Sequence, residues 1–320
     1  MPMAATACSG SSGMTSTGTA AALLEVEHLT HYRYAAPVDL AQHLAHLRPL
    51  DDPTQAVVHF DMQVDPPPQQ QRTERDRLRN HRTCFTLTQP HRELRVRSFS
   101  RVQVQAAPAP DVTASLPWER VRERLAYVAG APYEPAAEFV FASPFVPLLP
   151  ALRDLAWPSF APGTPVAAAA IDLMARIHAE FAYRSASTAI DTPLAEVLRT
   201  REGVCQDFAH LMIGALRSMG LAARYVSGYL LTAAPDPGAS AAPMLGADAS
   251  HAWVGVWCPM ADGSAARWLK LDPTNNLLPG TGHVRLAVGR DYGDVTPLRG
   301  VIRGGGEHRL EVQVQTRQVN

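Results

Sequence analysis

The segment Gly203-Val204-Cys205-Gln206-Asp207-Phe208-Ala209-His210 decides the fold, because it places a thiol where a helix is expected to begin. From position 208 to Met219, apolar residues recur at spacings of three and four, and Gly220 then offers a helix stop. Cys205 is therefore expected in the first turn of a helix. Unpaired N–H groups and the positive end of the helix dipole favour a thiolate there.

Two further polar groups lie in the strands that the sequence predicts downstream. In a strand expected at residues 250–258, His251 and Trp253 point to the same face. Asp272 ends a later strand, because Pro273 cannot donate to a central ladder. If the two strands are neighbours, His251 and Asp272 can meet across the sheet, and the start of the cysteine helix need only pack against them.

These three residue types are the set that cysteine chemistry requires. A thiolate attacks, a base holds and later returns a proton, and a third group fixes the imidazole tautomer, so Cys205, His251 and Asp272 are the predicted catalytic residues. The intermediate oxyanion would face the N–H of Cys205 and one side-chain donor that the sequence does not identify. Gln206, Trp253 and Tyr183 are weaker candidates for substrate contacts, and core packing is the favoured alternative for Trp253.

Each of these residues also has a structural interpretation. A single cysteine is more often a small buried apolar residue than a nucleophile, and only the ordered set of three raises the catalytic hypothesis above this alternative. A zinc site of Cys205, His210 and Cys258 is a weaker alternative, because no CxxC or HxxxH spacing is present. His210 lies off the helix face of Cys205 and is expected to be structural.

Length and composition exclude several function classes. At 320 residues the chain is expected to form two domains. A formal net charge of -1 provides no field to attract nucleic acid or an anionic membrane. No apolar run approaches the ~20 residues that span a bilayer, and the sparse cysteines suit a reducing compartment. We therefore expect a soluble cytoplasmic protein that acts on a peptide or protein, without a cofactor or metal, in an oligomeric state that the sequence leaves open.

The domain order follows from composition and periodicity. Residues 1–22 lack the features of a secretory signal and are expected to form a disordered tail. Short alternating patterns over residues 23–107 predict a β-rich N-terminal domain, and the Pro-rich residues 108–165 are interpreted as a connector. Helices followed by antiparallel strands over residues 166–300 predict an α+β core. Residues 301–320 contain a further strand, whose sheet the sequence does not identify.

A loop rich in Ala, Pro and Gly at residues 233–249 directly precedes the strand of His251. Long loops beside such residues are often functional, so we expect this one to be mobile and to border the cleft.

Four ordered blocks closely resemble the bacterial transglutaminase-like cysteine protease family: residues 201–210, 224–229, 250–253 and 271–275. The resemblance extends to residues 289–295 and, more loosely, to residues 29–34 and 37–38, which are similar to the family's β-rich N-terminal domain. It implies a transglutaminase core related to the papain fold, with a helix that carries the nucleophile packed on an antiparallel sheet. It also implies Cys205 as nucleophile, His251 as general base and acid, and Asp272 as the group that orients His251.

One departure from the family pattern lies in the N-terminal domain. The family usually has an aspartate and a Phe-Gly-Asn turn, where this chain has Asp76-Arg77-Leu78-Arg79-Asn80.

The leading hypothesis is a peptidase or amidase that passes through a thioester on Cys205. Transglutaminase-like cores also include amide-bond crosslinkers and inactive scaffolds. A protein-crosslinking or amine acyltransferase, and a non-catalytic binding module, are therefore the alternatives.

Overall fold

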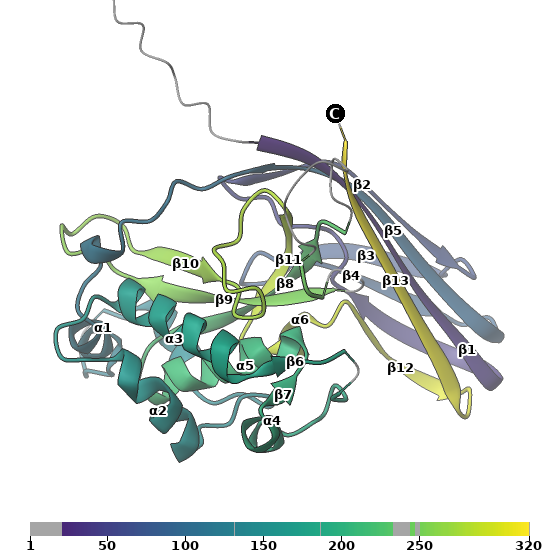
Figure 1. Cartoon of the computed structure of the whole chain (residues 1–320). Coiled ribbons are helices and arrows are strands. Elements are labelled where there is room, and N and C mark those ends of the chain that lie inside the picture. The colour runs from purple at the N-terminus through teal and green to yellow at the C-terminus, as the bar shows by residue number, and fades with distance from the viewer. Residues whose placement is uncertain (1–20, 131, 186, 233–243, 247–249, 320) are drawn as a thin grey trace, which may run out of the picture.

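The computed structural model describes residues 21–130, 132–185, 187–232, 244–246 and 250–319. Three layers follow one another in space: helices, an antiparallel core sheet and a β half-barrel (Figure 1). This is the predicted α+β fold with an all-β N-terminal domain. Of the expected tail, residues 1–20 lie outside the described residues, whereas Ala21 and Ala22 already belong to the first strand. No helix in the described part of the chain has the length and apolar character needed to cross a membrane.

The half-barrel is organised around one long strand, β1 (Ala21–Ala45), which pairs along its length with β5 and β4 and also with β13 and β12. The strands that complete this sheet are β2 (Gln55–Asp65), β3 (Gln70–Arg75), β4 (His81–Leu87), β5 (His91–Gln105), β12 (Leu298–Gly304) and β13 (His308–Val319). The C-terminal strands thus join the N-terminal sheet. Because β12 begins at Leu298, the core domain ends before the boundary at residue 300 that the sequence suggested.

The core sheet has the strand order β10-β9-β8-β11. Its strands are β8 (Ala223–Leu230), β9 (His251–Cys258), β10 (Arg267–Leu271) and β11 (His283–Gly289). Helices α3 (Val166–Glu180) and α5 (Cys205–Ser218) pack on one face, as their apolar periodicity predicts. The half-barrel covers the other face, where Tyr229, Val284 and Leu286 pack against apolar residues of β1 and β5.

The interpretation of residues 108–165 as a connector is wrong. They form α1 (Trp118–Leu125), α2 (Pro150–Ala156) and the short helices η1 (Val112–Ala114), η2 (Pro135–Val140) and η3 (Trp157–Ser159). Their buried side chains, among them Trp118, Phe139 and Leu152, pack in the same hydrophobic core as α5. The prolines mislead because several open or separate short helices, as Pro150 opens α2, and such helices are too short to show a period.

Side-chain amides of the half-barrel bind main-chain groups of β11, an edge strand of the core sheet. Gln55 accepts from the N–H of Arg285 at 2.8 Å and donates to its carbonyl oxygen at 2.8 Å. Asn80 makes the same two-way contact with Val288, again with both distances at 2.8 Å. Because an edge strand lacks a partner on one side, these amides satisfy groups that would otherwise be left unpaired. The Arg285 guanidinium adds two bonds of 2.7 Å to Asp52.

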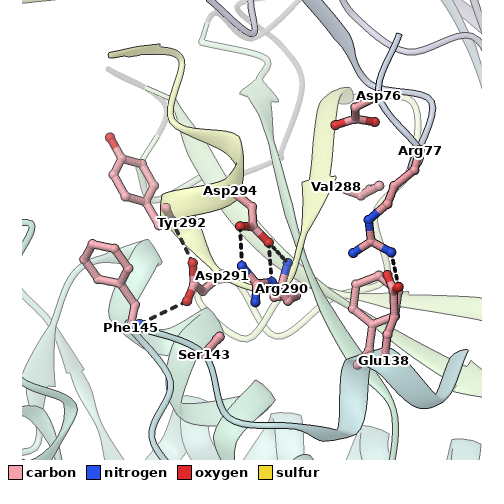
Figure 2. A network of polar contacts seen from close by, with 12 residues as sticks. Asp76, Arg77, Glu138, Ser143, Phe145, Val288, Arg290, Asp291, Tyr292 and Asp294 are labelled. Atoms are coloured by element: carbon pink, nitrogen blue, oxygen red, sulfur yellow. Dashed lines mark hydrogen bonds and ion pairs between the residues drawn. The ribbon is translucent and has the colours of Figure 1, made fainter. Parts of the chain in front are cut away.

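The hairpin of β3 and β4, whose turn carries Asn80, forms although its sequence departs from the family pattern. Asp76 accepts from the N–H groups of Leu78 and Asn80, both at 2.9 Å. Arg77 forms an ion pair with Glu138 of η2 (Figure 2), so this turn binds the core both here and at Asn80. Arg79 has a φ of 69°, in the left-handed region that favours glycine, at the position where the family usually has glycine.

Replacement of Arg79 by glycine is expected to stabilise the protein by about 0.5–1 kcal/mol. Relief of a left-handed conformation, about 1–2 kcal/mol, exceeds the extra chain entropy of glycine, about 0.5–1 kcal/mol. The midpoint of urea unfolding measures the change. Arg72→Gly, inside β3, is the control and is expected to destabilise. An equal loss of stability in both variants would contradict the explanation.

Candidate active site

Cys205 is the first residue of α5, and three local contacts fix the start of this helix. The Asp207 carboxylate accepts from the N–H of Val204 at 2.8 Å and from the Thr188 hydroxyl at 2.6 Å. Burial raises the pKa of Asp207, although both hydrogen bonds oppose the shift. A Cβ atom at Gly203 would lie 2.8 Å from the Cβ of Asp207, so only glycine fits there. The predicted helix start is therefore built around Asp207.

The core sheet brings His251 and Asp272 together. His251 begins β9, and Asp272 directly follows β10, the neighbouring antiparallel strand. The two side chains are fully buried, and Nε2 of His251 donates to Oδ2 of Asp272 at 2.9 Å. This bond leaves Nδ1 as the ring nitrogen available to Cys205, whose Sγ lies 3.9 Å from the carbonyl oxygen of Ser250. The three predicted residues thus converge, and we refer to Cys205, His251 and Asp272 as the triad.

Electrostatics in the triad favours a charged imidazole. Burial alone lowers the pKa of His251, but the negative charges of Cys205 and Asp272 outweigh it and raise the pKa to about 10. Burial raises the pKa of Asp272, yet the hydrogen bonds from His251 and His283 bring it well below its usual value. An imidazolium between two anions is the protonation state that supplies a thiolate and a proton donor together.

Three residues that the sequence analysis missed complete the surroundings of Asp272. Its Oδ1 accepts from the N–H groups of Thr274 and Asn275 at 3.0 and 3.2 Å. Its Oδ2 accepts from the Asn275 amide at 2.9 Å and from Nε2 of His283 at 3.3 Å. The Asp-Pro-Thr-Asn order is a turn signal that could have indicated the first two. Nothing local indicates His283, because its position depends on where β11 lies in the sheet.

Trp253 is a buried core residue, which differs from the expectation that it lines the site. Its side chain is 0% exposed and packs with Val226 and Val288. The indole lies over Gly228 of β8, where a Cβ atom would come within 2.3 Å of the ring. The alternative of core packing is therefore correct for this residue.

The other two residues considered for substrate contacts lie beside the triad. Gln206 donates to the carbonyl oxygen of Ile190 at 3.0 Å and so ties residues 187–192 to the first turn of α5. A Cβ atom at Gly246 would lie 2.9 Å from Nδ1 of His251 and 3.4 Å from the Tyr183 hydroxyl. Residues 244–246 of the predicted loop thus border the site, together with Tyr183. The rest of that loop lies outside the described residues.

The zinc alternative is wrong. His210 accepts from the N–H of Tyr292 at 3.2 Å, and burial lowers its pKa to about 3, so its ring is neutral and structural. The thiol of Cys258 faces the carbonyl oxygen of Val256 at 3.5 Å. Within the described ranges, no three His, Cys, Asp or Glu side chains are grouped so that they could hold a metal ion.

The motif at residues 289–295 supports α5 rather than the reacting groups. Arg217, in the last turn of α5, is buried and donates to the carbonyl oxygens of Arg290 at 2.6 Å and Ala223 at 2.9 Å. Figure 2 shows the turn itself, in which Arg290 pairs with Asp294 through two nitrogens and Asp291 accepts from the N–H of Phe145. Helix α6 (Tyr292–Val295) follows and holds His210. The turn therefore fixes the helix that carries Cys205 at two points.

A helix with an N-terminal cysteine, packed on an antiparallel sheet that supplies a histidine and an aspartate, defines a transglutaminase-like core. Residues 154–273 match the transglutaminase-like superfamily, and residues 24–103 match the bacterial transglutaminase-like N-terminal region. The chain belongs to this superfamily and carries both of these regions.

The relatives themselves are uncharacterized proteins. One from Mycobacterium tuberculosis and one from Mycobacterium bovis are each 42% identical over 288 residues, which cover 89% of this chain and 89% of each relative. One from Mycobacterium leprae is 30% identical over 295 residues, which cover 91% of this chain and 97% of the relative. A crystal structure of a candidate cysteine protease from Cytophaga hutchinsonii is similar in fold, with a TM-score of 0.69 at 20% identity, covering 94% of this chain and 92% of that one.

Iodoacetamide is expected to modify Cys205 faster than Cys84 and Cys258 near pH 7. His251 is protonated below its pKa of about 10, so near pH 7 an imidazolium lies beside the Cys205 thiol. Iodoacetamide reacts with the thiolate, and a cation beside a thiol favours that form, so Cys205 should react several times faster than Cys84. Peptide mapping by mass spectrometry measures each site.

Cys84 and Cys258, two of the other three cysteines, serve as internal controls. Burial raises the pKa of Cys258 to about 12, so this residue should stay unmodified. Cys84 is half-buried in the half-barrel. A Cys205 rate no higher than that of Cys84 would rule out the ion pair.

Proposed function

We propose that this chain is a cysteine hydrolase that cleaves amide bonds of peptides or proteins through a thioester on Cys205. One observation carries the proposal: Asp272 holds Nε2 of His251, and this leaves Nδ1 for the thiol at the start of α5. Asp272 thus orients the ring, His251 acts as the base, and Cys205 is the nucleophile, which is the arrangement that cysteine catalysis requires.

In the acylation step, the thiolate of Cys205 attacks the amide carbon, and the carbonyl electrons move to oxygen. The resulting oxyanion faces the N–H of Cys205, at the positive end of the α5 dipole. When the C–N bond breaks, His251 gives its Nδ1 proton to the nitrogen, and the amine leaves. Asp272 stays ionised and keeps the ring aligned.

In the deacylation step, neutral His251 accepts a proton from water as the water oxygen attacks the thioester carbon. Collapse of this second intermediate breaks the C–S bond and releases a carboxylic acid. The proton stays on His251, which restores the imidazolium and thiolate pair. An amine that enters in place of water gives a new amide instead, so hydrolase and acyltransferase differ only in the acceptor.

Intact-mass spectrometry of the full chain with a peptide library tests the proposal. The wild type is expected to show an acyl adduct on Cys205 and to release acid products, whereas Cys205→Ala should lose at least about a thousandfold in rate, as removal of a nucleophile does. Cys84→Ala is the matched control, because it removes a thiol of the half-barrel and should leave turnover unchanged.

Three outcomes would contradict hydrolysis through Cys205. Undiminished turnover with Cys205→Ala would show that the turnover does not come from Cys205. No adduct and no turnover with the wild type would favour a binding module. Products that carry an added primary amine, in preference to water, would identify an acyltransferase. The chain offers few acceptors of its own, since its only lysine, Lys270, lies 3.7 Å from Asp52 at the contact between half-barrel and core.

A further inference from the structure

A second histidine shares the carboxylate that orients His251. Nε2 of His283 lies 3.3 Å from Oδ2 of Asp272, the same oxygen that accepts from His251 at 2.9 Å. Because a carboxylate can only accept, both imidazoles must present an N–H at Nε2. We propose that His283 is a positioning residue, whose N–H holds Asp272 so that His251 is aligned with Cys205. The inference rests on the proposed function and deepens it.

The arrangement depends on a position without a side chain in the strand that lies between the two histidines. His251 lies on β9 and His283 on β11, and β8 separates these strands. Directly opposite His251 on β8 is Gly228, whose Cβ, if present, would lie 2.1 Å from the carbonyl oxygen of Val284. Since glycine has no side chain, residues of β9 and β11 can meet above β8. The Trp253 indole uses the same space and meets the His283 ring edge-on, with centroids 5.4 Å apart.

The packing around His283 fixes the orientation of its side chain. Its side chain is 2% exposed, and its main-chain N–H donates to Gly280 at 3.1 Å. Two residues along β11, the main chain of Arg285 is bound by Gln55 of the half-barrel. The donor to Asp272 is thus fixed by the strand, by the indole and by the contact between the two domains.

The neutral form of His283 suits this role. Burial lowers the pKa of His283, and the hydrogen bond to Asp272 offsets this only in part. A neutral Nε2–H donor holds the carboxylate without adding a second positive charge beside His251. A charged His283 would compete with His251 for Asp272 and repel it.

Alkylation of Cys205 by iodoacetamide near pH 6 tests the proposal, because it reports the aligned thiolate and imidazolium pair and needs no amide substrate. His283→Leu, which fills the space but donates nothing, is expected to slow alkylation roughly tenfold, the effect of one hydrogen bond to a charged group. His283→Gln, whose amide can occupy the place of Nε2, should stay within about threefold of wild type. Thermal unfolding checks that both variants are folded.

A double-mutant cycle shows whether His283 acts through Asp272. In an Asp272→Asn background, His283→Leu is expected to cause no further slowing, because the group that it positions has already lost its charge. Where His283→Leu does not fold, His283→Asn replaces it, since its shorter amide falls short of Asp272. Alkylation of His283→Leu at the wild-type rate, a glutamine variant as slow as the leucine variant, or full additivity with Asp272→Asn would each overturn the proposal.

The two proposals fail in different ways. If the wild type cleaves no amide but the His283 variants slow alkylation as described, the proposed hydrolase is wrong and the positioning role stands. If the wild type cleaves amides and all His283 variants match it in turnover and alkylation, only the positioning role is wrong.

Discussion

The carboxylate of Asp272 is buried with 0% exposure and accepts from five donors: two main-chain N–H groups, the Asn275 amide and two imidazoles. An ionised carboxylate is very costly in the interior unless nearly every lone pair is used. These donors come from a turn, from β9 and from β11. All three chain segments must therefore be in the correct register at the same time, and this requirement fixes the geometry around His251 and Cys205.

The half-barrel takes part in this arrangement, although none of its residues reaches the triad among the contacts described above. It covers one face of the core sheet and binds the exposed edge of β11 through Gln55 and Asn80. Its own sheet is completed by the C-terminal strands β12 and β13, so the chain returns to its starting domain after building the core. The two domains share strands and edge contacts, and the position of His283 depends on both.

Local patterns predicted much of the site because the reacting groups stand at element boundaries. Cys205 opens a helix with clear apolar periodicity, and His251 and Asp272 open and follow short strands with turn residues beside them. These local patterns did not predict contacts between residues that are distant in sequence. Trp253 lies on the face of His251 as alternation predicts, but Gly228 on the neighbouring strand lets its ring sink into the core. Residues 108–165 were misjudged because their helices are too short to show a period.

By itself, the sequence determined the residue types, their order and the elements that carry them, since these depend on periodicity, capping and turn preferences within a few residues. Only the tertiary structure decided which side chains meet. The convergence on Asp272, the place of His283 beside it and the pairing of β1 with β12 and β13 all depend on strand order. Strand order is set by packing and hydrogen bonding between segments up to hundreds of residues apart, which leave no local pattern in the sequence.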